Sequence, residues 1–237
     1  MRILFNFSPN FSKKIRSTSQ IKHVIIHYTG MQSEIDSINR LKNPNSKVSC
    51  HYLILRNGAI IQMIKDRYVA WHAGKSKWKK YVNLNANSIG IELTNKGHEY
   101  GYQNFTNKQI SSLIQLCKKI KKKYAIKTEN FLGHSDIAPL RKIDPGEKFP
   151  WKKLSEHNIG RWFKLNSKNV FSKIENKKKR FFQNLYNLGY RYFNIHKREL
   201  SDKKVIQSFQ MHYLPNNISG KIDQKTLKIS CFLINKV

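Results

Sequence analysis

Three residues with metal-binding side chains stand where functional sites tend to collect. His27 closes the apolar run IKHVIIHY, His134 sits in FLGHSDIAP, and Asp144 sits in RKIDPG. Each falls at the end of a predicted strand or in the loop beyond it, and loops carry a large share of binding and catalytic residues. Two imidazoles and a carboxylate can hold a zinc ion and leave a fourth tetrahedral position open for water, as in a catalytic zinc site.

The spacing of these residues does not by itself identify a metal site. They are far apart in the chain, and no H-E-x-x-H motif is present. A single histidine at a strand end is more often a satisfied surface or core residue. Glu92, in the run SIGIEL, is on its own more often a strand-end carboxylate paired with a lysine. From the residues alone, both interpretations stay open.

The elements that must position these residues alternate between strands and helices. Residues 21–28 and 88–93 are predicted to form buried strands. The runs CHYLILR and AIIQMI flank Asn57-Gly58, a strong hairpin signal. Helices are predicted over residues 34–41 and from Thr106 onward, where apolar residues recur at helical spacing. Gln109 follows Thr106 by three residues, which is close to a capping box. We therefore predict an α/β fold with a mixed central sheet flanked by helices.

The order of these elements predicts four segments. They are an N-terminal extension (1–20), a catalytic domain (21–162), a linker (163–173) and a small C-terminal three-helix domain (174–237). The last contains amphipathic helical patterns over residues 174–190, 201–213 and 223–234, with glycines as breakers beside them. A module of this size needs tight packing or docking on its neighbour.

The composition of the 237 residues limits the partners. Forty-five Lys and Arg against 14 Asp and Glu give a formal charge of +31, which favours a polyanionic partner or reflects a lysine-rich proteome. The three cysteines, Cys50, Cys117 and Cys231, form neither a metal pattern nor a disulfide framework and are expected to be free thiols. No run suits a transmembrane helix, and no clear signal peptide is seen, which favours the cytoplasm, with the periplasm as the alternative.

Several motifs together resemble a known enzyme family. The strings VIIHYTG, CHYLILRNG, WHAG, NSIGIEL, GHSDIAPLRKIDPG and FPW occur in the order found in type-2 N-acetylmuramoyl-L-alanine amidases, the AmpD/AmiD group, and most closely resemble the AmiD branch. The match runs from about Ile21 to Trp162. It implies a fold like those of T7 lysozyme and the peptidoglycan recognition proteins. It also implies zinc-dependent hydrolysis of the amide between N-acetylmuramic acid and the L-alanine of the peptidoglycan stem peptide.

The resemblance also implies roles for particular residues. The family's zinc ligands fall on His27, His134 and Asp144. Glu92 matches the general base and Lys142 the positive charge beside the reacting carbonyl. Both roles make chemical sense, because a carboxylate can accept the proton of a zinc-activated water and a fixed cation can stabilise an oxyanion.

Three further residues are expected to contact substrate. His72 in WHAG and His51 in CHY resemble positions that line the family's cleft, where His72 could hydrogen-bond the muramyl or lactyl carbonyl. Arg141 could bind stem-peptide carboxylates through its guanidinium fork. Tyr52 follows His51 on a strand, so the two face opposite sides, and His51 is the one predicted to face the site. A loop histidine and a solvated arginine are the alternatives for His72 and Arg141.

The C-terminal domain resembles the small helical peptidoglycan-binding domain. It carries LYNLGY, then VIQSFQ, then a G-x-x-D-x-x-T-L ending that starts at Gly220. The alternative is a packing module that only stabilises the catalytic domain.

Two other classes of function compete with hydrolysis. A non-catalytic peptidoglycan-recognition protein would lack a zinc ligand, whereas all three are present here. Nucleic-acid binding is suggested only by the charge, and no nucleic-acid motif accompanies it, so no specific nucleic acid is expected. The expected partners are peptidoglycan or (anhydro)muropeptides. The sequence leaves open which of these is preferred, the stem-peptide length and the oligomeric state.

Overall fold

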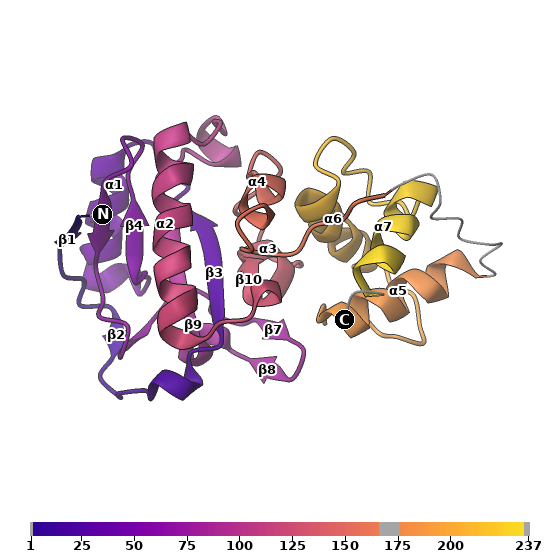
Figure 1. Cartoon of the computed structure of the whole chain (residues 1–237), viewed down its shortest axis with the longest axis horizontal. Helices are drawn as coiled ribbons and strands as arrows, with labels where there is room; N and C mark the ends of the chain where they lie inside the picture. The colour runs from indigo at the N-terminus through magenta and orange to yellow at the C-terminus, as the bar shows by residue number, and fades with distance from the viewer. Residues whose placement is uncertain (1, 166–175, 235–237) are drawn as a thin grey trace.

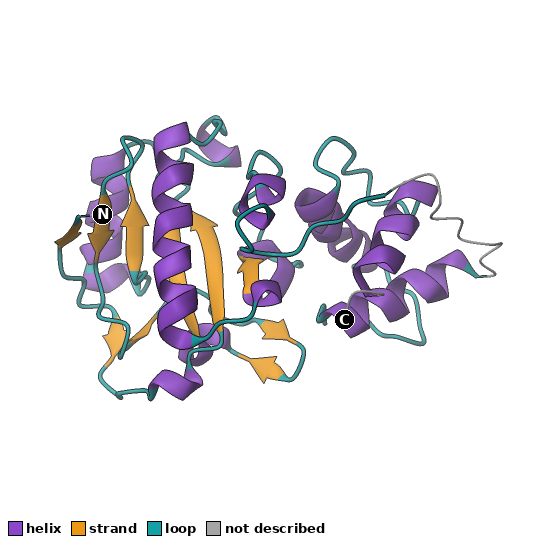
Figure 2. Cartoon of the chain, in the orientation of Figure 1, coloured by secondary structure: helices purple, strands orange, loops and turns teal. Residues whose placement is uncertain are grey.

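The computed structural model describes residues 2–165 and 176–234, and its centre is a six-stranded sheet (Figures 1 and 2). In spatial order the strands are β1 (Ile3–Phe5), β5 (Ile60–Gln62), β4 (Tyr52–Ile54), β9 (Ser88–Leu93), β3 (His23–Tyr28) and β10 (Phe131–Gly133). The β4–β5 pair is antiparallel and the other pairs are parallel, so the predicted mixed sheet is confirmed.

The predicted hairpin accounts for the antiparallel pair. Leu55 donates its N–H to the carbonyl of Ala59, and Gly58 has φ +87°, a conformation that glycine adopts without a steric penalty. Two further pairs of short strands lie outside the main sheet: β2 (Phe11–Ser12) with β6 (Val69–Ala70), and β7 (Lys77–Trp78) with β8 (Tyr81–Val82).

Helices cover both faces of the sheet. α2 (Asn107–Tyr124) lies across one face, as Figure 1 shows, and packs its apolar stripe, which includes Leu113 and Cys117, on β3 and β9. Its N-terminus is held by the predicted capping box of Thr106 and Gln109. The other helices of this part are α1 (Glu34–Lys42), α3 (His134–Ile137) and α4 (Trp151–Ser155). Single 3₁₀ turns complete it: η1 (Thr18–Gln20), η2 (Pro44–Ser46), η3 (Leu84–Asn87), η4 (His98–Tyr100) and η5 (Thr128–Asn130).

The N-terminal residues are part of this folded unit. β1 pairs with β5 at the edge of the main sheet, and the Asn10 amide donates to the carbonyls of Asn43 and Val48. Arg16 is buried, and its guanidinium donates to the carbonyls of Asp66 and Ser88. The boundary predicted at residue 21 therefore marks where the motifs begin and not where the folded unit begins.

The C-terminal residues form the predicted helical module, defined here as residues 176–234. It contains α5 (Lys177–Leu188), α6 (Asp202–Tyr213) and α7 (Gln224–Ile234), which Figure 2 shows as a group of helices beside the sheet. One continuous apolar cluster joins Ile25 and Ile137 of the sheet domain to Phe181 and Phe209 of the module. Most of the predicted linker, residues 166–173, lies outside the described residues, as do residues 174–175 and 235–237 of the predicted domain.

Two other expectations can be compared with the described residues. Cys50, Cys117 and Cys231 are free and buried, as predicted. Within the described ranges, none of the helices combines the length and the apolar character needed to span a bilayer.

Candidate metal centre

Parallel strand pairing brings the first site residues together. β3 and β9 run side by side in register, with His27 opposite Glu92. β10 flanks β3 on its other side and ends at Gly133, so that His134 follows directly. Because the carboxyl ends of parallel strands meet at one edge of a sheet, three side chains from distant parts of the sequence are brought to the same edge.

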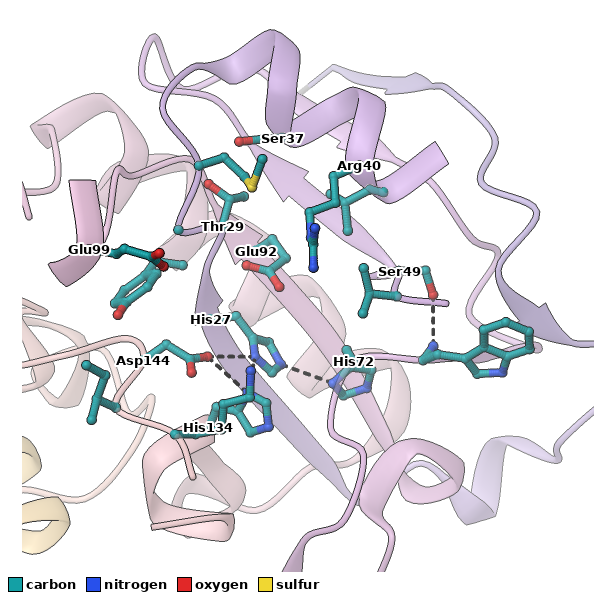
Figure 3. A pocket seen from close by; sticks show the side chains of 18 of the residues that line it. His27, Thr29, Ser37, Arg40, Ser49, His72, Glu92, Glu99, His134 and Asp144 are labelled. Atoms are coloured by element: carbon teal, nitrogen blue, oxygen red, sulfur yellow. Dashed lines mark hydrogen bonds and ion pairs between the residues drawn. The ribbon is translucent and has the colours of Figure 1, made fainter. Parts of the chain in front are cut away.

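The three predicted ligands converge on one point. Asp144 Oδ2 lies 2.9 Å from His27 Nδ1 and 3.1 Å from His134 Nδ1, and the two Nδ1 atoms are 3.0 Å apart. All three residues are buried, and their ligand atoms lie within 4.8 Å of one another (Figure 3). Zinc bonds of about 2.0–2.1 Å in a tetrahedron would separate ligand atoms by roughly 3.3 Å. The donor set and its spacing therefore fit a zinc ion.

Hydrogen bonds on the far side of each imidazole point the Nδ1 lone pairs inward. Ser88 Oγ donates to the carbonyl of Leu84, so it is free to accept from His72 Nε2 at 3.2 Å. His72 Nδ1 then accepts from His27 Nε2 at 3.1 Å. These bonds assign the Nε2–H tautomer to His27 and leave its Nδ1 free to bind a cation.

His134 is oriented in the same way. Its Nε2 lies 3.1 Å from the carbonyl of Ala73, to which it donates, so its Nδ1 is also unprotonated. Arg141 Nη2 donates to the same carbonyl and lies 3.2 Å from His134 Nε2. Since both nitrogens carry hydrogens, Ala73 O is the acceptor that they share.

Burial and neighbouring charges favour the protonation states that the candidate ligands need to bind a metal. Burial, together with repulsion from His134, lowers the pKa of His27 to about 4. Burial alone would raise the pKa of Asp144, but the charge and hydrogen bonds that the two imidazoles supply when a proton is on Nδ1 outweigh it and hold that pKa well below its usual range. A neutral imidazole and an ionised carboxylate are the forms that coordinate a cation.

Glu92 stands beside this triad without a hydrogen-bond donor. Its Oε2 is inaccessible to solvent and has no partner among the described residues. Burial raises the pKa of Glu92 to about 8, with a further contribution from Asp144, while Lys142 opposes the shift. Glu92 and Lys142 both line the cleft, a cavity of about 440 Å³ above the triad.

His51 does not reach this cleft, which corrects the prediction that it contacts substrate. Its side chain is 0% exposed and lies behind His72, with the ring centroids 5.7 Å apart. Its Nδ1 accepts from the N–H of Gly90, and its Nε2 lies 3.1 Å from the carbonyl of Tyr68 and 2.7 Å from Arg16 Nη2. Tyr52 points the opposite way and donates to Asp66, as strand alternation requires.

The other two predicted substrate residues do line the cleft, but their polar atoms are engaged. Both ring nitrogens of His72 are used by His27 and Ser88, which does not support the predicted hydrogen bond to a substrate carbonyl. Arg141 donates to the carbonyls of Ala73 and Lys75, so its fork is partly occupied.

The cleft also contains residues that the sequence did not single out. Arg40 extends from α1 and Glu99 comes from η4 (Figure 3). Tyr100 of η4 and Met31, which follows β3, also line the cleft. Arg40 looked like an ordinary basic residue in the last turn of a helix. No motif could have identified these residues, because their place in the cleft depends on how α1 and η4 fold over the sheet edge.

Comparison with known proteins agrees with this geometry. Residues 17–147, which include the three predicted ligands and Glu92, match the family model described as N-acetylmuramoyl-L-alanine amidase. The N-acetylmuramoyl-L-alanine amidase AmiD of Escherichia coli is 35% identical over 233 residues, covering 92% of this chain and 83% of the relative. The 1,6-anhydro-N-acetylmuramyl-L-alanine amidase AmpD of Haemophilus influenzae is 35% identical over 164 residues, covering 62% of this chain and 86% of the relative.

Solved structures show the same similarity. The complex of E. coli AmiD with anhydro-N-acetylmuramic acid-L-Ala-D-gamma-Glu-L-Lys superposes with a TM-score of 0.78 at 34% identity, covering 92% of this chain and 90% of that one. AmpDh3 of Pseudomonas aeruginosa, in complex with an anhydromuramic pentapeptide, gives a TM-score of 0.83 at 28% identity and covers 96% of both chains.

Proposed function

We propose that this chain, which belongs to the N-acetylmuramoyl-L-alanine amidase family, is a zinc-dependent hydrolase of the amide between the lactyl group of N-acetylmuramic acid and the stem-peptide L-alanine. The family and fold predicted from the motifs are confirmed by these comparisons. The observation that carries the zinc proposal is the convergence of His27, His134 and Asp144 on one point beside Glu92.

Glu92 is proposed as the general base. A bound zinc would polarise the amide carbonyl and lower the pKa of a water to about 7. Glu92 has an oxygen without a donor, so it can take a proton from the attacking water and later deliver it to the leaving amine of L-alanine. Its pKa of about 8 belongs to the protein without a cation, and a nearby positive charge would lower it.

Lys142 and the rim of the cleft are proposed to bind the substrate. Lys142 lines the cleft, and its charge contributes to the low pKa of His27 and opposes the rise in the pKa of Glu92. The same charge would stabilise a developing oxyanion. Arg40 and Arg141 add cationic groups at the rim that suit the carboxylates of a stem peptide. His72 is proposed to orient His27.

Product analysis tests this proposal directly. The full-length protein is incubated with anhydromuropeptides with zinc, with a chelator, and with zinc restored after the chelator. We expect a free stem peptide that begins at L-alanine, its loss on chelation and its return with zinc, detected by mass spectrometry. Zinc-loaded protein that leaves the substrate intact would instead support peptidoglycan recognition without catalysis, and binding would then be measured.

A further inference from the structure

The helical module holds the segment that carries a candidate zinc ligand. α3 begins with His134, and two residues later Asp136 points away from the cleft with only 1% of its surface exposed. Asp136 Oδ1 accepts a 2.6 Å hydrogen bond from the hydroxyl of Tyr190. Its Oδ2 accepts from His212 Nδ1 at 2.8 Å and from the N–H of Gly133 at 2.8 Å. Two of these three donors belong to the module.

Ser135 links the two candidate ligand segments to the module. Its N–H donates to the carbonyl of Asp144 at 2.8 Å, and its carbonyl accepts from Ser208 Oγ on α6 at 2.8 Å. The residue directly after one ligand is thus bonded to the backbone of the other ligand and to the module. Ser135 therefore contacts α6 directly, and the Asp144 segment is joined to α6 only through Ser135.

Packing keeps the two module donors in place. The ring of Tyr190 meets Trp78 edge-on, with centroids 4.9 Å apart, and Gly189 allows this approach because a Cβ there would lie 2.4 Å from Trp78. The ring of His212 stacks on Trp151 of the sheet domain at 4.1 Å and 11°. Rings buried at this interface have few alternative orientations.

The donors from the module keep the buried carboxylate of Asp136 hydrogen-bonded. Among the described residues, no lysine or arginine forms an ion pair with this buried carboxylate, and the hydrogen bonds from Tyr190, His212 and Gly133 hold it in place. Without the two module donors it would keep only the N–H of Gly133. A buried carboxylate that loses its donors moves toward water, and a shift of Asp136 would rotate the single turn that also carries His134.

We propose that Tyr190 and His212 are positioning residues of the metal centre, and that through them the helical module raises the affinity of the site for zinc. This inference rests on the proposed zinc site. It gives the module a role at the reaction centre that does not depend on binding wall polymer. Outer contacts of metal ligands commonly change metal affinity by about 10–100-fold, and we expect an effect of that order here.

The test measures zinc affinity in the full-length chain by competition with a fluorescent chelator. Tyr190→Phe removes one hydroxyl and keeps the ring, and His212→Leu removes the other donor. Each is expected to weaken zinc binding by about 10-fold or more. His212→Asn keeps an N–H near the position of Nδ1 and should recover most of the lost affinity.

Gln210→Leu is the matched control. Gln210 lies on α6, is 0% exposed, and bonds only within the module, to the carbonyl of Lys221 and the N–H of Gly220. Its replacement should lower the melting temperature and leave zinc affinity unchanged. The visible spectrum of the Co²⁺-substituted proteins gives a second readout, which should change in Tyr190→Phe and His212→Leu but not in Gln210→Leu.

The possible results are distinguishable. Wild-type zinc affinity in Tyr190→Phe and His212→Leu, with only a lower melting temperature, would overturn the positioning role and leave the proposed function intact. A wild-type protein that binds no zinc would overturn both. Should His212→Leu fail to fold, Tyr190→Phe, which removes a single oxygen atom, decides the question.

Discussion

At the scale of single residues, Glu92 and Asp144 show how two neighbouring carboxylates can differ in their affinity for a proton. Asp144 is surrounded by imidazoles, which hold its pKa well below the usual range, whereas burial raises the pKa of Glu92 to about 8. Two carboxyl groups with such different proton affinities suit different roles, ligand and proton carrier.

Replacing Glu92 by glutamine should separate these roles. Glu92→Gln keeps the shape of the side chain but cannot take a proton, so kcat should fall by about 10²–10⁴ while zinc content stays at the wild-type level. Metal analysis and steady-state kinetics check both. Glu99→Gln, which also changes a carboxylate in the cleft, is the control and should retain turnover; full activity of Glu92→Gln would remove the proposed base.

Gly90 is a second residue with a defined consequence. A Cβ at this position would lie 2.4 Å from Cγ of His72, whose ring hydrogen-bonds His27. Gly90→Ala should therefore displace His72, weaken zinc binding, and destabilise the fold by about 1–3 kcal/mol. Zinc titration and thermal unfolding measure the two effects. Ile89→Val, in the same strand, should cost only about 0.5–1.5 kcal/mol and leave zinc affinity unchanged.

The motifs predicted the residues that converge at the centre but not all of those around it. His27 and Glu92 lie near the ends of β3 and β9, and His134 directly follows β10, so their meeting at a sheet edge follows from parallel pairing. Asp144 comes from the loop after α3, which the Ser135 N–H holds through the carbonyl of Asp144. His51 was placed wrongly because alternation only distinguishes two faces of a strand. Both faces of β4 are covered, so neither side chain reaches the cleft.

At the scale of elements, the N-terminus of α2 offers a test that is independent of catalysis. Thr106 Oγ1 accepts from the N–H of Gln109 at 3.0 Å and donates to the carbonyl of Arg56 at 2.6 Å. Thr106→Ala should lower the unfolding free energy by about 1 kcal/mol, with kcat unchanged. Urea unfolding measures this loss. Asn107→Ala, one residue further on, is the control and should lower the unfolding free energy by less. Equal losses in the two variants would argue against the cap.

The elements themselves were predictable where the local pattern is strong. The hairpin at Asn57-Gly58, the capping box of α2 and the three module helices were all predicted from spacing and turn residues. β1 was not predicted, because its three residues show no alternation of apolar and polar side chains and form a strand only by pairing with β5. The contacts of Asp136 could not be predicted from the sequence either, since Tyr190 and His212 lie 54 and 76 positions further along the chain.

At the scale of the whole molecule, buried histidines predict how stability depends on pH. Burial, with repulsion from Lys79 and Lys22, lowers the pKa of His23 to about 4, while an unfolded histidine titrates near 6.5. Between these values the unfolded chain binds more protons. The stability of the fold is therefore fully present above pH 6.5 and falls as the pH drops toward 4, by up to about 1.4 kcal/mol per pH unit for this group.

Removing His23 should reduce this dependence. Urea unfolding of metal-free protein at several pH values between 4.5 and 7.5 is expected to give a shallower slope for His23→Gln than for the wild type. His157, which is exposed, provides the control, because His157→Gln should keep the wild-type slope. An unchanged slope in His23→Gln would show that other groups account for the acid sensitivity.

The hydrogen bonds from Tyr190 and His212 to Asp136 have a consequence for the growing polypeptide during translation. His27, His134 and Asp144 have all been synthesised well before Tyr190 and His212, which follow Asp144 by dozens of residues. A nascent chain thus passes through a stage in which every proposed ligand has been made but the turn bearing His134 lacks the hydrogen bonds from Tyr190 and His212. Since residues far apart in sequence make contact slowly, tight metal capture is expected only after the ribosome has released α6.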